Sequence, residues 1–148
     1  MRPLFLALAI GSLLILSTGS SFAQTVGPPQ QILGVYAQIE VQDSSGNLIS
    51  YLETSRATVI DPGKFNQLIN QNMDQFKSNI ITVGGQNIEI LKANDTIVHP
   101  SATIVSQNLI SVKTSSGTET LVTADHDGYP VVKGDKVTTY WTIIRTAS

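Results

Sequence analysis

Apolar and polar residues alternate with a period of two through most of the chain after residue 31. In "GVYAQIEVQD" the apolar positions are Val35, Ala37, Ile39 and Val41. This alternation is typical of a strand with one buried and one solvated face. The turn "SSGN" (44–47) and the returning segment "LISYLET" predict a first hairpin, and "RATVI" (56–60) predicts a third short strand.

The period changes to that of a helix after Asp61. Asp61 can accept hydrogen bonds from the free N–H groups of a first turn, and Pro62 suits the first helical position. The apolar residues that follow are three or four positions apart: Phe65, Leu68, Ile69, Met73 and Phe76. They predict an amphipathic helix of three to four turns whose stripe docks on the sheet. A groove for a lipid or a cofactor is the alternative use of such a stripe.

The second half returns to the texture of strands. "NIITV" and "QNIEIL" flank Gly84-Gly85, which predicts a hairpin, and "SATIVSQ", "NLISVKT" and "TETLVTA" follow. The last segment, "KVTTYWTIIRT" (136–146), is partly apolar on both faces, which favours a central strand covered on each side. We therefore expect a mainly β fold: a sandwich or partly closed barrel of eight or nine short strands, with one amphipathic helix inserted after the third strand.

The first 23 residues have the pattern of a secretory signal peptide. One cation at Arg2 precedes an apolar run, and Ser21-Phe22-Ala23 supplies small side chains before Gln24. An uncleaved anchor is the alternative, but the run of about 13 residues is short against the roughly 20 that span a bilayer. The predicted organisation is a signal peptide (1–23), a flexible arm with two prolines (24–31) and a single β-rich domain (32–148). The mature protein is expected outside the cytoplasm without membrane insertion.

The amino-acid composition excludes several classes of catalytic and binding activity. The chain has no cysteine, which excludes thiol nucleophiles, iron–sulfur clusters and cysteine-ligated metals. The formal net charge is −2 and the lysines and arginines are scattered, so nucleic acid is not an expected partner. None of the sequence motifs of nucleophile elbows, phosphate-binding loops, dinucleotide-binding turns or zinc proteases is present. The sequence indicates no catalytic residue and no cofactor, and it favours a function other than that of an enzyme.

Two residues outside the predicted core could carry a modification or a ligand. Asn94-Asp95-Thr96 is an acceptor triplet for N-glycosylation on an expected exposed turn. His99 precedes Pro100, and this pair favours a turn that ends a strand over a ligand.

The segment "TADHDGYPVVKGDK" (123–136) has two possible interpretations. Asp125, His126 and Asp127 could offer two carboxylates and an imidazole to a divalent ion, with Asp135 returning to the same loop. However, the spacing does not match a calcium loop, and the three side chains converge only if the chain turns there. The Asp-Gly and Lys-Gly-Asp sequences are typical of turns chosen for backbone reasons. We favour the turn, with a positive φ at Gly128, and keep the metal site as the alternative.

Two stretches resemble a known group of proteins. "VYAQIEVQDSSGNLISYLE" and "HDGYPVVKGDKVTTYWTIIR" are similar to small secreted proteins of ammonia-oxidising archaea and cover about a quarter of the chain. The resemblance implies an extracellular or cell-envelope location and no particular activity. "VVKGDKVTTYW" also resembles a strand of cupredoxins, but a blue-copper centre requires a cysteine, so only the sandwich architecture could be shared.

Two functions follow as hypotheses. The first is a non-catalytic secreted or cell-envelope β-domain that binds an extracellular polymer, a glycan or a protein. A variant of it is self-assembly, in which residues 24–34 pair with the open sheet edge of a neighbour. The second is a metal-binding protein or metal-assisted enzyme centred on residues 125–127.

Overall fold

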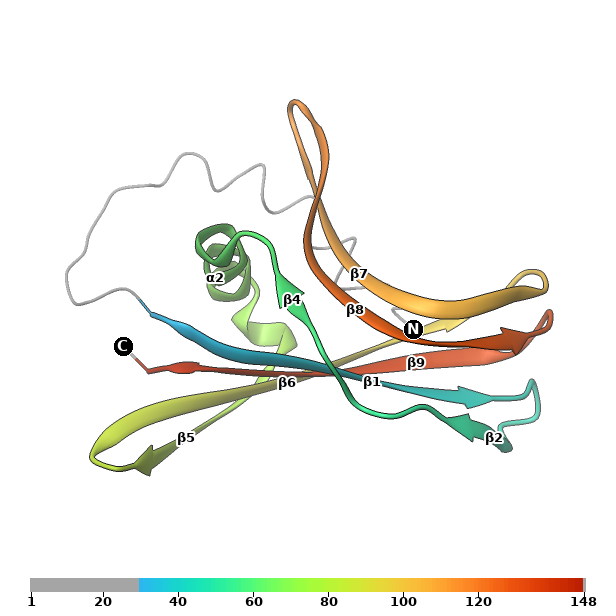
Figure 1. Ribbon diagram of the computed structural model, residues 1–148, viewed down its shortest axis with the longest axis horizontal. Helices are drawn as coiled ribbons and strands as arrows, with labels where there is room; N and C mark the ends of the chain where they lie inside the picture. Colours follow the sequence, from blue (N-terminus) through green and yellow to red (C-terminus); the bar gives the residue numbers. More distant parts are fainter. Residues whose placement is uncertain (1–29, 148) are drawn as a thin grey trace.

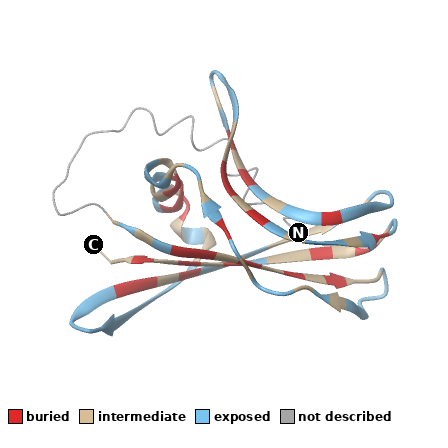
Figure 2. Cartoon of the chain, in the orientation of Figure 1, coloured by how far each residue is buried: buried red, intermediate tan, exposed pale blue. Residues whose placement is uncertain are grey.

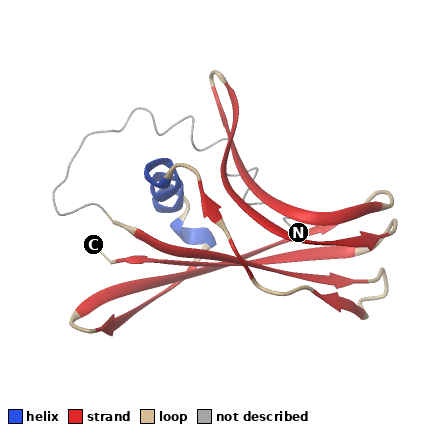
Figure 3. Cartoon of the chain, in the orientation of Figure 1, coloured by secondary structure: helices blue, strands red, loops and turns tan. Residues whose placement is uncertain are grey.

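Within residues 30–147 the chain folds into two antiparallel sheets and one α-helix (Figures 1 and 3). The computed structural model describes residues 30–147. Sheet A has the order β2-β1-β9-β6-β5, with β3 also paired to β1, and sheet B has the order β4-β8-β7. The strands of sheet A are β1 (Ile32–Gln42), β2 (Leu48–Tyr51), β3 (Ser55–Arg56), β5 (Lys77–Val83), β6 (Gln86–Val98) and β9 (Lys136–Thr146). Those of sheet B are β4 (Thr58–Val59), β7 (Thr103–Thr114) and β8 (Gly117–Val131).

This architecture confirms the predicted fold class. The nine strands form two layers without closing into a barrel, and the β7–β8 hairpin arches over one face of sheet A (Figure 1). No helix within residues 30–147 has the length and apolar character needed to cross a bilayer. The predicted signal peptide and residues 24–29 of the predicted arm lie outside the described residues.

The remainder of the predicted arm is held in place. The N–H of Gln31 donates to Thr146 Oγ1 (2.8 Å), and the carbonyl of Gln31 accepts from the N–H of Thr146 (2.9 Å). Asn66 Nδ2 on the helix donates to the carbonyl of Gln30 (2.8 Å). The last two residues of the predicted arm are therefore part of the folded domain.

The segment "RATVI" crosses from one sheet to the other instead of forming one strand. β3 pairs with β1 in sheet A, whereas β4, two residues later, pairs with β8 in sheet B. Ala57 lies between them, is buried, and donates its N–H to the carbonyl of Val35 (2.7 Å). The helix is consequently inserted after the fourth strand and not after the third.

Helix α2 (Pro62–Gln71) begins as the sequence predicts. Asp61 is the N-cap, and its side chain accepts from the N–H of Lys64 (3.1 Å). The helix ends earlier than predicted, because Asn72 caps it and donates from Nδ2 to the carbonyl of Leu68 (2.8 Å). A short 3-10 turn, η1 (Met73–Gln75), follows and leads into β5.

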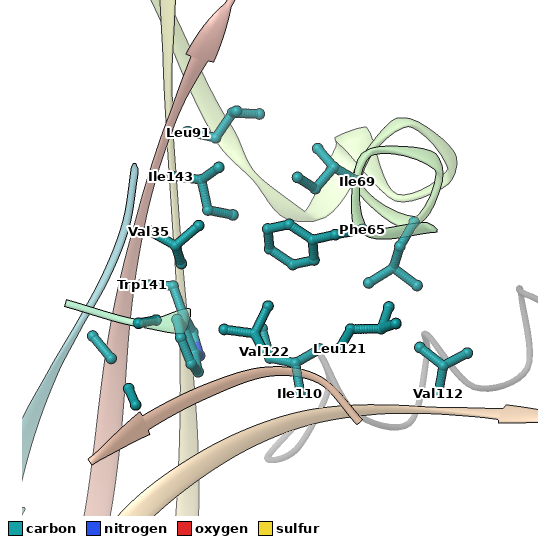
Figure 4. Close-up of a cluster of buried hydrophobic side chains, with 14 residues drawn as sticks. Val35, Phe65, Ile69, Leu91, Ile110, Val112, Leu121, Val122, Trp141 and Ile143 are labelled. Carbon is teal, nitrogen blue, oxygen red and sulfur yellow. The ribbon is translucent and has the colours of Figure 1, made fainter. Parts of the chain in front are cut away.

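The predicted docking of the helix is confirmed. Its apolar stripe packs between the two sheets with side chains from β1, β6, β7, β8 and β9 (Figures 2 and 4). The main core consists of Val35, Ala37, Ala57, Phe65, Leu68, Ile69, Leu91, Ile110, Val112, Leu121, Val122, Ala124, Trp141 and Ile143. A second cluster toward the other end of the sandwich contains Ile39, Val41, Val105, Val131 and Val137.

Strand β8 departs twice from regular pairing with β7. Ile110 pairs with Val122 and Ser111 with Thr120, so Leu121 is an extra residue on β8. Such a bulge turns two consecutive side chains toward one face, and both Leu121 and Val122 are indeed buried. The predicted strands "SATIVSQ" and "NLISVKT" are one continuous strand, β7, opposite these bulges.

Strand β9 is central in sheet A, between β1 and β6, as predicted. The prediction that both of its faces are covered is wrong. Helix α2 and sheet B both lie on the face that carries Trp141, and neither covers the face that carries Tyr140 (Figure 1). The apolar residues on the second face therefore do not indicate a second layer, and that face is the place to look for a site.

Candidate functional site

The outer face of sheet A, opposite the helix and sheet B, contains a groove of about 440 Å³. Its volume lies within the roughly 300–1,000 Å³ that is typical of ligand sites. The lining comes from η1 and from every strand of sheet A except β3: Gln38, Tyr51, Gln75, Lys77, Lys92, Ala93, Asn94, Tyr140, Trp141 and Thr142.

Register places the polar side chains of the groove in rows across the strands. Gln38 of β1 is opposite Tyr140 of β9, which is opposite Asn94 of β6. In the neighbouring row Thr142 of β9 is opposite Lys92 of β6. Directly opposite residues of antiparallel strands share a face, so amide and hydroxyl groups form a continuous polar floor.

Two tyrosine side chains lie among and beside these polar groups. Tyr51 on β2 and Tyr140 on β9 are 54% and 36% exposed. The hydroxyl of Tyr140 donates to Glu40 Oε1 (2.8 Å), and Glu40 is directly opposite Tyr51. Burial, together with the hydrogen bond and the charge of Glu40, raises the pKa of Tyr140 to about 12. The phenol is therefore neutral at physiological pH, and its ring is held by the hydrogen bond.

A third tyrosine on the same face is already occupied. The ring of Tyr36 lies over Gly34, where a Cβ would come within 3.0 Å of its atoms, and Arg56 stands 5.9 Å from its centroid. This cation–π contact uses the ring face that a ligand would need. Tyr36 does not line the groove.

Two lysines occupy the far end of the groove. Lys77 of β5 and Lys92 of β6 are directly opposite each other, and both are exposed. The ion pairs of the described chain are Lys64–Glu119 and Arg145–Glu89, and neither includes these lysines. Like charges directly opposite on a sheet are destabilising. The two ammonium groups form a positive end of the groove, and no carboxylate within residues 30–147 forms an ion pair with them.

The predicted loop at 123–136 has a different structure. Asp125, His126, Asp127 and Gly128 lie within β8, so the turn interpretation is wrong. Between the pairs Val105–Tyr129 and Gln107–Asp125 β8 has three residues where β7 has one, so "HDG" is a β-bulge. Gly128 is absent from the glycines with positive φ in the described chain, and the tight turn lies instead at Gly134, with φ of 95°.

The bulge directs His126 between the sheets and leaves the carboxylates outside. Asp125 and Asp127 are exposed, and Asp125 Oδ1 accepts from Gln107 Nε2 (2.9 Å). Within residues 30–147 no group of three or more histidine and carboxylate side chains could hold a metal ion. Asp135 is also committed elsewhere, because its Oδ2 accepts from the N–H of Val132 (2.9 Å) in the β8–β9 turn.

His126 joins the two sheets. Its Nδ1 is 2.9 Å from the hydroxyl oxygen of Ser55 on β3. Burial lowers the pKa of His126, and this effect outweighs the Glu53 carbonyl and the nearby aspartates, which act in the opposite direction. The imidazole is therefore held neutral, in a structural contact between β3 and β8.

The two remaining candidate residues from the sequence analysis are Asn94 and His99, and the structure agrees with the prediction only for His99. Asn94 is exposed, but it lies within β6 and lines the groove, so the expectation of a turn at the acceptor triplet is wrong. His99 directly follows β6, as predicted for a residue that ends a strand. Its N–H donates to the carbonyl of Asp135 (2.9 Å), and its carbonyl accepts from the N–H of Gly134 (2.8 Å).

Reasoning from the sequence missed the groove. Its residues come from strands that are distant along the chain, and only the pairing of β1, β9 and β6 brings them together. The available signal was the polar face of β1, "Y-x-Q-x-E", beside the "TTYWT" of β9. Comparisons of the chain with protein-family models, curated proteins and solved structures found no match.

Proposed function

We propose that the protein is a non-catalytic binding module that acts outside the cytoplasm and holds a polysaccharide in the groove of sheet A. The extracellular location rests on the predicted signal peptide (1–23) and on the resemblance to small secreted archaeal proteins. The observation that carries the proposal is the pairing of two partly exposed tyrosines, Tyr51 and Tyr140, with a floor of amide and hydroxyl groups.

These groups match the surface of a sugar unit. A pyranose has an apolar C–H face, which can stack on a tyrosine ring, and an edge of hydroxyl groups. The side chains of Gln38 and Asn94 each offer both donors and an acceptor, and Thr142 offers a hydroxyl. The fixed ring of Tyr140 loses little conformational freedom on binding, because Glu40 already orients it.

A direct test is titration calorimetry with soluble polysaccharides of known composition, neutral and acidic. We expect Tyr51→Ala to weaken binding about tenfold, since truncation of an aromatic side chain that contacts the ligand costs roughly 1–2 kcal/mol. Leu109→Ala is the matched control, because Leu109 is similarly exposed (48%) but lies on β7 of the other sheet. A wild-type protein that binds no polysaccharide, or equal affinity in Tyr51→Ala, would refute the proposal.

A further inference from the structure

The charges around the groove are arranged asymmetrically. At one end Glu40 is directly opposite Tyr51 and accepts from the Tyr140 hydroxyl. At the other end Lys77 and Lys92 are directly opposite each other and both line the groove. A ligand laid across the strands from β2 to β5 therefore passes from a negative to a positive environment.

At the positive end of the groove the described chain supplies no ion-pair partner for the two lysines. Within the described chain Lys64 pairs with Glu119 and Arg145 with Glu89, whereas Lys77 and Lys92 have each other as direct cross-strand neighbours. An anion placed between the two ammonium groups would replace a repulsive contact with two attractive ones. Glu40 would repel the same anion at the opposite end, so the charge also sets the direction of the ligand.

We infer that the polysaccharide is acidic, with an anionic group on the sugar unit between Lys77 and Lys92 and uncharged units beside Tyr51 and Tyr140. This inference rests on the proposed function and names its substrate class. A nucleic acid fits less well, because its closely spaced phosphates would meet Glu40 and only two cations on a chain of formal net charge −2. An acidic polysaccharide carries its charges one or two sugar units apart and keeps neutral faces for the tyrosines.

The test compares two polymers with the same backbone. Hyaluronan carries a carboxylate on every second unit, and its methyl ester removes the charge while preserving the sugar rings. We expect the wild-type protein to bind hyaluronan about five- to tenfold more tightly than the ester in 50 mM NaCl, as two partly solvated ion pairs would produce. The preference should diminish in 500 mM NaCl, where exposed charges are screened.

The variant that isolates the charge is Lys77→Gln combined with Lys92→Gln. It should bind the two polymers with equal affinity. The control is Lys113→Gln with Lys133→Gln, which changes the net charge equally at exposed residues outside the groove and should keep the preference. Melting temperatures no lower than that of the wild type would show that both variants fold, and we expect this because all four side chains are exposed.

The outcomes separate the two proposals. Equal wild-type binding of both polymers would overturn the acidic ligand and leave the polysaccharide module standing. Absence of binding to either polymer and to the neutral panel would overturn both. A single-stranded DNA oligonucleotide that binds as tightly as hyaluronan, and loses affinity in the groove variant, would assign the site to nucleic acid and overturn the inference.

Discussion

Charged side chains on the inner face of sheet A have ion-pair partners within the described chain, whereas the lysines of the groove on the outer face do not, although residues of the two faces alternate along the same strands. On the inner face Arg145 is 2% exposed, and each of the three nitrogens of its guanidinium has a protein partner. Nε donates to Glu89 (2.9 Å), and the two terminal nitrogens donate to Asn66 (3.0 Å) and Asn70 (2.9 Å) on α2. On the outer face Lys77 and Lys92 are opposite each other and exposed.

The difference separates a structural charge from one available for binding. Arg145 ties α2 to the last strand, and its hydrogen bonds and ion pair are completed within the fold. Lys77 and Lys92 have no ion-pair partner within the described chain, so a partner of opposite charge would have to come from a ligand. A charged side chain that is paired within the fold stabilises the domain. A charged side chain without such a partner is the better indication of a ligand site.

The largest effect should come from breaking the inner-face pair. Glu89→Gln preserves the shape of the side chain but leaves the Arg145 charge buried without a carboxylate. Removal of one partner of a buried pair costs about 3–5 kcal/mol of unfolding free energy, which urea denaturation would measure. Glu119→Gln is the control, because it breaks the exposed Lys64–Glu119 pair and should change stability little. Similar midpoints for the two variants would contradict the comparison.

The apolar part of the inner face should follow in size. Leu68 is 1% exposed in the main core, so Leu68→Ala should cost about 2–5 kcal/mol through lost contacts and a cavity. Gln67→Ala is the matched control on the exposed side of the same helix turn and should melt like the wild type. Small, equal losses at both positions would mean that α2 is not firmly docked on the core.

Two glycines near the C-terminal hairpin should differ for a backbone reason. Gly134 has a φ of 95°, which side chains with a Cβ adopt at a cost, so Gly134→Ala should destabilise by about 1 kcal/mol or more. At Gly128 an added Cβ would meet Ile104 Cγ2 at 2.9 Å, and this methyl group moves only through a change of the χ1 rotamer, for which the exposed position of Ile104 leaves room. Gly128→Ala should therefore cost less than Gly134→Ala. Chemical denaturation of both would reveal a reversed order, which would restore the turn to residues 125–128.

The smallest effect should be a dependence of stability on pH at the contact between the sheets. The pKa of His126 is lowered by burial from its ordinary value of 6.5, so at mildly acidic pH the unfolded state binds a proton that the folded state does not. Stability should fall as the pH drops below about 6.5 and level off below the folded pKa.

Thermal melting between pH 8 and pH 4.5 would measure this dependence. His126→Gln can retain a hydrogen bond to Ser55 and should flatten the curve. The lowered pKa of Asp43, which results chiefly from its hydrogen bond with the Asn47 backbone, affects stability mainly at pH values below this range, as the pH approaches the ordinary value of 3.8. A curve of unchanged slope in His126→Gln would show that the buried imidazole is not the linked group.

Local patterns were sufficient for most of the secondary structure. The alternation in β1, the N-cap at Asp61 and the glycine pair at 84–85 each depend on a few consecutive residues, and each appears in the structure as predicted. The apolar stripe of the helix also identified its buried face, because the period of 3.6 residues places Phe65, Leu68 and Ile69 on one side whatever they pack against.

The tertiary structure decided the features that depend on partners distant in sequence. "RATVI" has one alternating pattern, yet Ala57 divides it between two sheets because β1 and β8 lie on either side of it. "DHDG" reads as a turn from its residue types, but the long pairing of β8 with β7 makes it a bulge. The groove depends in the same way on register across β1, β9, β6 and β5, which sets Tyr140 beside Gln38 and Lys92 beside Lys77. Composition and periodicity describe each strand alone, whereas a site on a sheet is a property of how the strands are aligned.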